Sequence, residues 1–417
     1  MPDLPRLLVI APHGSYRTSA FITAAHRLGV RVLLVSEGKH SIVSEYARGL
    51  HIDLTDQSAA LDLILQEAAR ESIAGIVATD DSTTELAARA ASQLGLPHNP
   101  AAAVHLARRK DQARTCLAAA HVRVPNHRCL NLAQPLSPQL SDIDFPVVIK
   151  PVGLSGSRGV IRVNNASELN LGIQRIQAML QRETHLDPDV ARLLLLEAYI
   201  PGAEVAVEGM LTAGKLQILT VFDKPDPLDG PYFEETYYTT PSRHAPDVLA
   251  SLEQSVQAAC AAYGLREGPV HAECRLNAEG VWLLEVAART IGGLCGRLLQ
   301  FGTGYSLEEL VLAQAMGRSL PLEVAQHGAG VLMIPIPKAG VLKRVEGILA
   351  AQRVPYIESV EIQIREGHEL VPLPEGASYL GFIFARAPSA AQAETALRAA
   401  HACLNIVVAP LWKVSVA

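Results

Sequence analysis

The sequence lacks the signatures of several common protein classes. Its six cysteines form no CxxC pair, which is typical of a protein from a reducing compartment. No apolar run approaches the roughly 20 residues of a membrane-spanning helix, and the first run, Leu7 to Ala11, is too short for the core of a signal peptide. No basic run marks a path for a phosphate backbone. We therefore expect a cytoplasmic protein that binds neither nucleic acid nor a membrane.

The sequence does contain enough apolar material for more than one core. Its 417 residues are 49% hydrophobic and only 19% charged, with a formal net charge of −6. A domain takes roughly 150 residues, so the length allows about three. This composition excludes a solvated, disordered chain, because such chains are poor in apolar residues. We expect a globular protein.

The first hundred residues alternate between apolar strands and amphipathic helices. A strand, a glycine-containing loop, a helix and a second strand ending near Ser36 form a β-α-β unit. A further helix, a strand that ends in Asp80 and Asp81, and another helix complete a doubly wound α/β domain over 1–104. The loop at Gly14 lacks the second and third glycines of a dinucleotide-binding fingerprint, which disfavours a nicotinamide cofactor.

The rest of the chain predicts a central and a C-terminal region. After a proline-containing linker, the pattern strand, loop, strand, helix and strand extends to Ile200. Alternating strands then surround one helix over 248–263. Beyond about Ala325, β-rich stretches are followed by a late helix over 390–404.

The first candidate for a chemical role is VVIKPVGLSGSRGVIRV, in which a strand ends at Lys150 beside a loop that contains Gly153, Gly156 and Gly159. Glycine permits close backbone approach, exposed N–H groups can point at anionic oxygens, and a lysine adds a positive charge. It is not a Walker loop, because no GK[ST] sequence opens a helix. By itself, the segment fits a phosphate clamp and a plain glycine-rich hairpin equally well.

The second candidate is LLLLEAYIPGAEVAVEG, where an apolar strand ends at Glu197 and restarts after a Pro-Gly turn at Glu204. A purine could pair its N6 donor and N1 acceptor with Glu197 and the exposed main chain, while Glu204 accepts from ribose hydroxyls. On this segment alone, two solvated acids at a strand boundary are favoured.

The third candidate is a hairpin, HAECRLNAEGVWLLEVAAR, with Glu273 on its first strand and Glu285 on its second. The period of two places His271 on the face of Glu273, and Arg289 on the face of Glu285. The two carboxylates can therefore face each other, which suits Mg²⁺ with phosphate oxygens and water as further ligands. Without a cation, two buried carboxylates would repel, so the alternative requires them to be exposed or paired with arginine.

In their order and spacing, these motifs together resemble the ATP-grasp superfamily: Lys110, Lys150 with its glycine loop, the hinge from Glu197 to Glu204, and the hairpin of Glu273, Glu285 and Arg289. The resemblance covers most of the chain. The N-terminal α/β region is similar to the domain that precedes ATP-grasp modules. The ending LGFIFARA with AETALRAAHACLNI is similar to the C-terminal domain of amino-acid-ligase and biotin-carboxylase relatives.

The resemblance implies an ATP-grasp fold, α/β and α+β in class. Its parts would be an N-terminal doubly wound α/β domain over 1–104 and an ATP-grasp module over 105–325. A lid subdomain would occupy about 140–200 of that module, and a C-terminal α+β domain would cover 326–417.

The resemblance also implies which residues bind ATP. Lys110 would touch the α-phosphate, Lys150 would bridge adenine and phosphates, and the glycine loop would close over the β- and γ-phosphates. The hinge would hold the adenine edge and the ribose. In chain order, the residues of this set are Lys110, Lys150, Ser155, Gly156, Ser157, Gly159, Glu197, Ala198, Ile200 and Glu204.

For the metal and the reacting carboxylate, the resemblance implies that Glu273 and Glu285 carry Mg²⁺ or Mn²⁺ and that Arg289 stabilises an acyl phosphate. The sequence departs here from the family pattern E-x-N-x-R, because Ala287 stands in place of the asparagine ligand. A similar loss occurs in the branch that resembles bacterial L-amino acid ligases. It leaves the coordination of a second metal open.

Four further residues are candidate substrate contacts. The segment FDKPDPLDGPYFEETYYTTPS is similar to the L-amino acid ligase branch and supplies Glu235 and Tyr238, although a proline-held structural loop is equally compatible. Asp81 lies at the end of a strand, where ligands bind in open α/β sheets, but a helix N-cap is favoured. His271 could shuttle a proton, but a satisfied strand histidine is favoured.

The resulting hypothesis is an ATP- and Mg²⁺-dependent carboxylate–amine ligase. ATP would phosphorylate a small-molecule carboxylate, and an amine would attack the acyl phosphate to give an amide, ADP and phosphate. One alternative is a bicarbonate- or formate-activating enzyme. Another is a non-catalytic nucleotide-binding module, which the alanine at 287 prompts. The resemblance also implies a homodimer.

Overall fold

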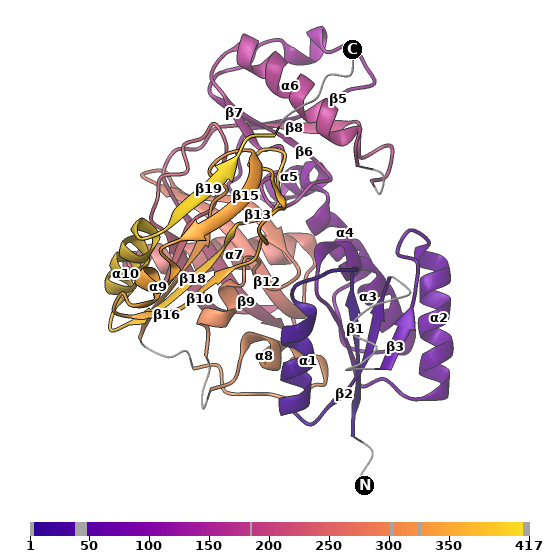
Figure 1. Cartoon of the computed structure of the whole chain (residues 1–417). Helices are drawn as coiled ribbons and strands as arrows, with labels where there is room; N and C mark the ends of the chain where they lie inside the picture. The colour runs from indigo at the N-terminus through magenta and orange to yellow at the C-terminus, as the bar shows by residue number, and fades with distance from the viewer. Residues whose placement is uncertain (1–3, 38–47, 184–185, 301–303, 324–326, 412–417) are drawn as a thin grey trace, which may run out of the picture.

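Four β-sheets organise the computed structural model, which describes residues 4–37, 48–183, 186–300, 304–323 and 327–411. Figure 1 shows an N-terminal α/β unit beside a large central sheet, with a smaller unit that carries β5 to β8 above them. The fold class predicted from the sequence, an ATP-grasp arrangement of α/β and α+β parts, is confirmed.

The N-terminal unit is the predicted doubly wound α/β domain. Its elements are β1 (Arg6–Ala11), α1 (Thr18–Arg27), β2 (Arg31–Ser36), β3 (Arg48–His51), α2 (Gln57–Arg70), β4 (Gly75–Ala78) and α3 (Asp81–Leu94). The strand order is β3-β2-β1-β4, and all neighbours are parallel. Leu7 and Val9 pack with α1, whereas Leu8 and Ile10 pack with α2 and α3. The apolar run from Leu7 to Ala11 suits this place, because helices cover both faces of a parallel sheet.

One of the helices that cover the N-terminal sheet comes from much later in the chain. Helix α8 (Leu307–Ala315) packs beside α1 and against β4. At Gly75 the approach is so close that a Cβ would lie 2.3 Å from the carbonyl oxygen of Ala315. The N-terminal sheet and the central module are therefore joined by direct packing as well as by the chain.

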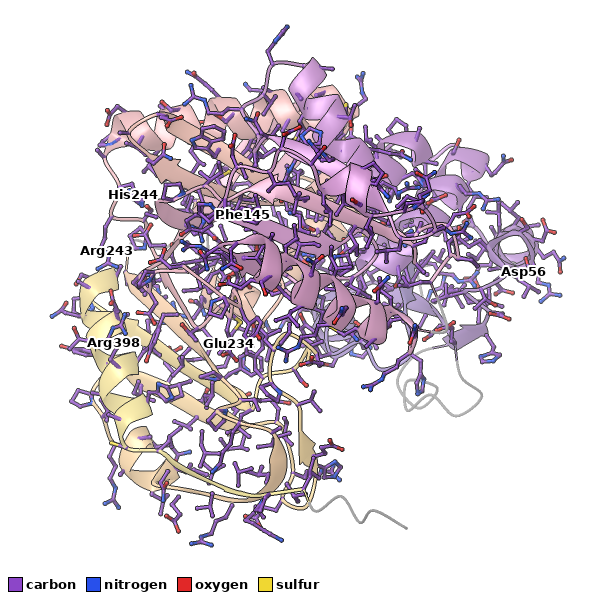
Figure 2. The ribbon with its side chains drawn as sticks, turned by 90° about the horizontal axis from the view of Figure 1, so that it is seen from above. Asp56, Phe145, Glu234, Arg243, His244 and Arg398 are labelled. Atoms are coloured by element: carbon purple, nitrogen blue, oxygen red, sulfur yellow. The ribbon has the colours of Figure 1, made fainter. Side chains whose placement is uncertain are left out.

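Capping residues determine where several helices begin and end. The Asp56 carboxylate accepts a hydrogen bond from the Ala59 N–H at the start of α2, and Figure 2 shows Asp56 at the opposite end of the molecule from Arg398. Gly95 ends α3 with a φ of 66°. Both residues are the types preferred at these helix ends, since aspartate is a good N-cap and glycine adopts the left-handed conformation without a steric penalty.

The lid unit is an antiparallel sheet of order β5-β8-β6-β7 with one covering helix. Its elements are β5 (His127–Asn131), η2 (Ser137–Leu140), β6 (Val147–Pro151), β7 (Ile161–Val163), α6 (Ala166–Leu180) and β8 (Leu193–Ala198). The predicted order of strand, loop, strand, helix and strand is confirmed. Strand β5 was not expected from the sequence. It is a short edge strand with little apolar alternation, and it extends the sheet before residue 140.

The central sheet has eight strands in the order β13-β12-β9-β10-β11-β14-β18-β16. Helices α4, α5 and α7 cover the end formed by β9, β12 and β13. The elements from this part of the chain are α4 (Ala101–Arg108), α5 (Lys110–Ala119), β9 (Ala203–Thr212), β10 (Lys215–Lys224), β11 (Tyr237–Thr240), α7 (Pro246–Tyr263), β12 (Gly268–Asn277), β13 (Gly280–Ala287) and η3 (Cys295–Leu298).

The C-terminal region continues this sheet. Its elements are β14 (Gly328–Ile334), β15 (Gly340–Glu346), α9 (Ile348–Gln352), β16 (Ile357–Ile362), β17 (Glu369–Leu370), β18 (Gly381–Ala387), α10 (Ala390–Ala402) and β19 (Asn405–Ala409). Strand β11 pairs with β14, so hydrogen bonding runs across the position where the sequence suggests a boundary, between 325 and 326. Strands β17, β15 and β19 form a separate small sheet.

Ion pairs reinforce the junction between the central module and α10. Arg243 contacts Asp223 and Glu394, and Arg398 of α10 contacts Asp226. Figure 2 shows Arg243 and Arg398 on the same side of the molecule. None of the helices in the described part of the chain has the length and apolar character needed to cross a bilayer.

Candidate functional site

The lid, the central sheet, the N-terminal strand ends and the C-terminal region enclose a cavity of about 580 Å³. This is within the ordinary range for sites that take small molecules. Every residue that the sequence proposes for the site lines the cavity except Gly159. The ordered motifs, which extend from Lys110 to Arg289 in the chain, therefore meet in one space.

The glycine loop between β6 and β7 lies over one side of the cavity. Gly156 and Ser157 adopt positive φ values of 65° and 57°, so the backbone turns sharply where the sequence predicts a phosphate clamp. Gly159 has a different role. Its N–H donates to the carbonyl of Pro374 at 2.9 Å, and a Cβ there would lie 2.9 Å from the Pro151 ring. This glycine lets the loop pack against the C-terminal region.

At the hinge, Glu197 lies buried between two cations. One carboxylate oxygen contacts the guanidinium of Arg114 and the other contacts the ammonium of Lys150. Burial raises the pKa of Glu197, but the two cations outweigh it and lower the pKa to about 2. Burial also lowers the pKa of Lys150, assisted by the nearby Arg114 and only partly offset by Glu197.

Arg114 was not anticipated from the sequence. It lies on α5 four residues after Lys110, and residues at this spacing share a helix face. That spacing is the signal that could have identified it. Lys110 itself contacts Glu285, with 3.2 Å between Nζ and Oε1.

A second group of charges surrounds Lys224 at the end of β10. Its ammonium lies 2.8 Å from Oε1 of Glu204 and 3.3 Å from Oε1 of Glu273, and it also contacts Glu235. The three acids offer ligand oxygens that all lie within 4.8 Å of one another. The second oxygen of Glu204 accepts from Nε of Arg275 at 3.0 Å. Glu204, expected to hold ribose, is thus paired with two cations.

The acids of this group share too little positive charge. Burial raises the pKa of Glu235 to about 7; repulsion from Glu273 and Glu204 adds to the rise, while Lys224 opposes it. For Glu273, burial also raises the pKa, but Lys224 and His271 outweigh it and hold the pKa well below its usual range. Glu235 is therefore partly protonated near pH 7, and an added cation would favour loss of that proton.

These charges fit a divalent cation. Glu273 and Glu285 are cross-strand partners of the hairpin, as the period of two predicts, although a bulge follows Glu273. Mg²⁺ prefers carboxylate oxygens with open positions for phosphate and water. Ala287 is buried on the same strand as Glu285 and offers no ligand atom, so no side chain at that position replaces the family's asparagine. Glu273 and Glu285 as metal ligands stay a prediction.

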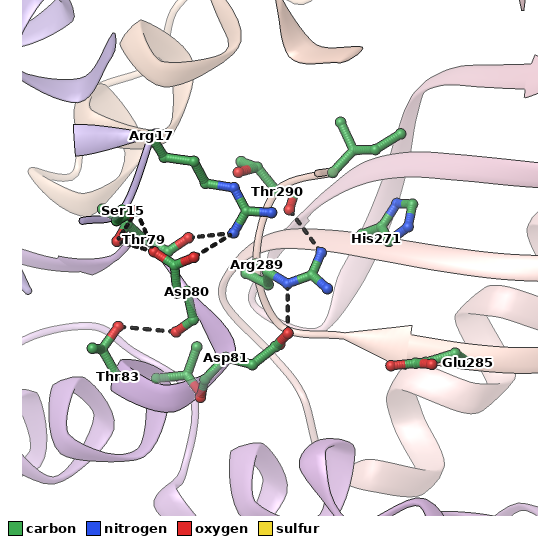
Figure 3. A network of polar contacts seen from close by, with 12 residues as sticks. Ser15, Arg17, Thr79, Asp80, Asp81, Thr83, His271, Glu285, Arg289 and Thr290 are labelled. Atoms are coloured by element: carbon green, nitrogen blue, oxygen red, sulfur yellow. Dashed lines mark hydrogen bonds and ion pairs between the residues drawn. The ribbon is translucent and has the colours of Figure 1, made fainter. Parts of the chain in front are cut away.

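At the N-terminal side, Arg289 pairs with Asp81, with 2.9 Å between Nε and Oδ2 (Figure 3). Burial raises the pKa of Asp81, but Arg289 outweighs it and lowers the pKa. The N-cap interpretation of Asp81 is wrong by one residue. Asp80 has the extended backbone of the N-cap, and Asp81 is the first helical residue, which frees its carboxylate to face the cavity.

The remaining two candidates lie on either side of Glu273. Tyr238 is buried, with its ring 5.1 Å from the Lys224 ammonium, so it supports that cation. His271 lies between two acids: Nδ1 is 3.5 Å from Glu208 and Nε2 is 3.6 Å from Glu273. Its Nδ1 is buried without a hydrogen bond to any described residue, contrary to the expectation of a satisfied strand histidine.

Comparison with known protein families gives three matches along the chain. Residues 22–98 match the ATP-grasp N-terminal domain, residues 143–297 match the ATP-grasp domain, and residues 332–409 match the L-amino acid ligase C-terminal domain 2. The three matches follow the order of the structural units.

Individual proteins are similar over longer stretches. The protein y4rH of Sinorhizobium fredii (strain NBRC 101917 / NGR234) is 23% identical over 415 residues, which is 97% of this chain and 84% of that protein. Carnosine synthase 1 of Homo sapiens is 27% identical over 346 residues, 78% of this chain but only 41% of that protein. The chain thus spans less than half the length of the carnosine synthase that it matches.

Among solved structures, an L-amino acid ligase from Bacillus licheniformis superimposes with a TM-score of 0.80 at 23% identity. The superposition covers 98% of this chain and 100% of that one. At this level of identity, the likeness establishes a shared fold.

Proposed function

The chain belongs to the ATP-grasp superfamily, and from that premise we propose that it is an ATP-dependent carboxylate–amine ligase with at least one amino acid substrate. One observation carries the proposal: a single cavity collects the predicted nucleotide motifs, a buried group of acids and Arg289. The match to the L-amino acid ligase C-terminal domain and the similarity to carnosine synthase support an amino acid as substrate.

The proposed reaction has two steps. A carboxylate oxygen attacks the γ-phosphorus of ATP, and the bond from that phosphorus to ADP breaks. An amine nitrogen then attacks the carbonyl carbon of the acyl phosphate, the C–O bond to phosphate breaks, and phosphate leaves with the bonding electrons. The nitrogen loses a proton, and the products are an amide, ADP and phosphate.

The side chains that line the cavity supply positioning and positive charge for these steps. Lys110 and Lys150 would hold the phosphates, and Arg289 would stabilise negative charge on the reacting carboxyl group. Asp81 anchors Arg289, so this guanidinium is oriented before substrate arrives. Glu273 and Glu285 would hold Mg²⁺, which neutralises charge on phosphate oxygens when bound.

The lid supports the chemistry by excluding water. Its loop is tied to the C-terminal region by the bond from Gly159 to Pro374 and by one from Arg158 Nε to the carbonyl of Glu375 at 3.3 Å. An acyl phosphate exposed to water would hydrolyse, so a covered cavity favours attack by the amine.

The test incubates purified protein with ATP, Mg²⁺ and pooled L-amino acids, and follows nucleotides and new masses together. The expected result is ADP with a product of dipeptide mass. ADP that depends on bicarbonate would instead identify the bicarbonate-activating alternative, and AMP would contradict the acyl-phosphate chemistry. Thermal stabilisation by ATP without any ADP would identify a binding module.

A matched pair of variants tests whether the proposed metal ligand in the hairpin is required for activity. We expect Glu285→Ala to lower ADP formation by at least 100-fold, because it removes a carboxylate proposed to hold the metal. Glu279→Ala changes an exposed acid in the turn of the same hairpin and should leave the rate unchanged. Full turnover by Glu285→Ala would contradict the mechanism. The homodimer and the cytoplasmic location stay predictions, the first of which light scattering checks.

A further inference from the structure

At the N-terminal end of the cavity, two guanidinium groups are anchored to consecutive aspartates (Figure 3). Arg289 pairs with Asp81, and Arg17 reaches Asp80, with 3.4 Å between Nη1 and Oδ1. Arg17 precedes α1 in the loop after β1, and the aspartates follow β4. Because β1 and β4 are adjacent parallel strands, both loops meet at the carboxyl edge of the sheet, where ligands bind in open α/β folds.

Arg17 is only partly neutralised there. Its shortest hydrogen bond, 2.7 Å from Nη1, is to the neutral carbonyl of Thr79. The carboxylate of Asp80 instead accepts hydroxyl donors, from Ser15 at 2.6 Å and from Thr79 at 2.5 Å, both on Oδ2. The Arg17 side chain is 11% exposed. Only one N–H of this buried guanidinium reaches its carboxylate partner Asp80, at 3.4 Å, so a further anion on the rest of the group would stabilise it.

The free part of Arg17 has the shape of a carboxylate site. Within the described residues, its side-chain hydrogen bonds run only through Nη1. Its Nε is buried and has no hydrogen-bond partner among them. Nε and Nη2 form the side-on edge of a guanidinium, which carries two parallel N–H donors and matches the two oxygens of a carboxylate.

The segment after Arg289 keeps this edge uncovered. A Cβ on Gly292 would lie 3.2 Å from Nη2 of Arg17 and 3.3 Å from the hydroxyl of Tyr16. That hydroxyl accepts from the Gly293 N–H at 3.1 Å, which holds the glycine segment beside the arginine. A side chain at 292 would crowd the guanidinium.

We propose that Arg17 binds the free α-carboxylate of the amino acid that serves as the amine substrate, and so determines that this substrate is an amino acid rather than a simple amine. The inference rests on the proposed ligase function. The donor's carboxylate is consumed as acyl phosphate, whereas the acceptor keeps its own carboxylate in the product. The attacking nitrogen must be neutral, so a subsite for the acceptor needs a cation for its carboxylate more than an acid for its amine. Arg17, beside an aspartate already satisfied by hydroxyls, meets that need.

The test is a competition between acceptors. The enzyme receives ATP, Mg²⁺, the 20 L-amino acids and an equimolar pool of their α-amides, and mass spectrometry compares dipeptides with dipeptide amides. The α-amides of Asp and Glu are left out because they keep a side-chain carboxylate; every other α-amide has no carboxylate to activate and acts only as acceptor. Amino acids and their α-amides differ in the intrinsic reactivity of the amine. This difference cancels when the product ratio of a variant is compared with that of the unchanged protein.

We expect Arg17→Met to lower the ratio of dipeptide to dipeptide amide by about 10- to 100-fold, the range for losing charge-assisted hydrogen bonds. Arg17→Lys keeps the positive charge but loses the two parallel N–H donors, so its product ratio should lie between that of Arg17→Met and that of the unchanged protein. Arg27→Met is the control: its side chain is 63% exposed at the end of α1, the helix that follows Arg17, and does not line the cavity. Its ratio should equal that of the unchanged protein.

Each other outcome overturns the inference or the function beneath it. A lower rate with an unchanged ratio in Arg17→Met would mean that the arginine is structural. A raised KM for ATP with an unchanged ratio would mean that it binds a phosphate. No ADP and no peptide from the unchanged protein would refute the ligase proposal itself, whatever the variants do.

Discussion

Two acids of the cavity, Glu197 and Glu235, lie in similar surroundings and have opposite electrostatic character. Both belong to the lining of the cavity and both contact a lysine. Burial raises both pKa values, yet that of Glu197 falls to about 2 and that of Glu235 rises to about 7. The difference comes from the ratio of cations to acids. Glu197 alone has two cations, whereas Glu235, Glu204 and Glu273 share Lys224, with Arg275 at Glu204.

This contrast separates a centre whose charges are balanced from a centre with an excess of acid. The site around Glu197 is electrically complete, and it ties the lid strand β8 to helix α5. The site around Glu235 has an excess of acid and is stabilised by an added cation. Charge balance in the ligand-free protein therefore indicates where a metal or a cationic substrate group belongs.

The largest effect is expected from breaking the complete centre. Glu197→Gln leaves Arg114 and Lys150 buried without their counter-ion, and we expect a loss of about 3–5 kcal/mol in the free energy of unfolding at pH 7. Urea unfolding measures it. Because the folded pKa is depressed, this carboxylate stabilises the protein above pH 4.5 and loses that effect as the pH falls toward 2. The gap between the variant and the unchanged protein should therefore close over that window, and a gap that is constant with pH would contradict the assignment.

Removing the shared cation of the other centre should give a smaller effect, which also shrinks as the pH falls but does so at higher pH. Lys224→Met leaves three acids without their common partner, and we expect a loss of about 2 kcal/mol at pH 8. Protonation of these acids relieves the repulsion, so the loss should shrink toward pH 5. An equal loss at both pH values would refute the proposed excess of negative charge.

Magnesium sharpens the same comparison. At ten times its dissociation constant, Mg²⁺ should restore about 1.4 kcal/mol of the unfolding free energy in Lys224→Met. In Glu197→Gln the proposed metal site is intact, so Mg²⁺ should stabilise this variant and the unchanged protein equally and leave the gap between them unchanged. A gap that narrows in both variants would show that the ion acts nonspecifically.

The smallest effect is expected from an ion pair outside the cavity. Arg175 of the lid helix contacts Glu375 of the C-terminal region through two bonds, 2.5 and 2.9 Å long, but both side chains are partly exposed. Glu375→Gln should lower the unfolding free energy by less than about 1 kcal/mol, and 0.5 M salt should abolish the difference. A loss as large as that in Glu197→Gln would contradict the view that burial determines these energies.

The features anticipated from the sequence depend on local pattern. The apolar strands and amphipathic helices of the N-terminal unit, and the hairpin that makes Glu273 and Glu285 partners, all follow from periods of two or 3.6 residues. The ordered motifs also anticipated that Lys110, Lys150, Glu197 and Arg289 would line one cavity.

The features that were missed depend on contacts between distant segments. Strand β5 exists because β8 offers it an edge, and β14 joins the central sheet because it pairs with β11. Local sequence favours a helix cap at Asp81 because its partner, Arg289, is 208 positions away. Nothing near Arg17 in the sequence indicates that it reaches the same cavity.

Local sequence was sufficient to identify the class of fold, the family and a set of side chains that line one cavity, because these leave periodic patterns and spaced motifs. Only the folded chain decided which acid meets which cation. The pKa of a buried carboxylate depends on burial and on charges a few ångströms away, and Glu197 and Glu235 obtain those charges from different segments. Glu197 thus links two subdomains, whereas Glu235 belongs to a site with too little positive charge.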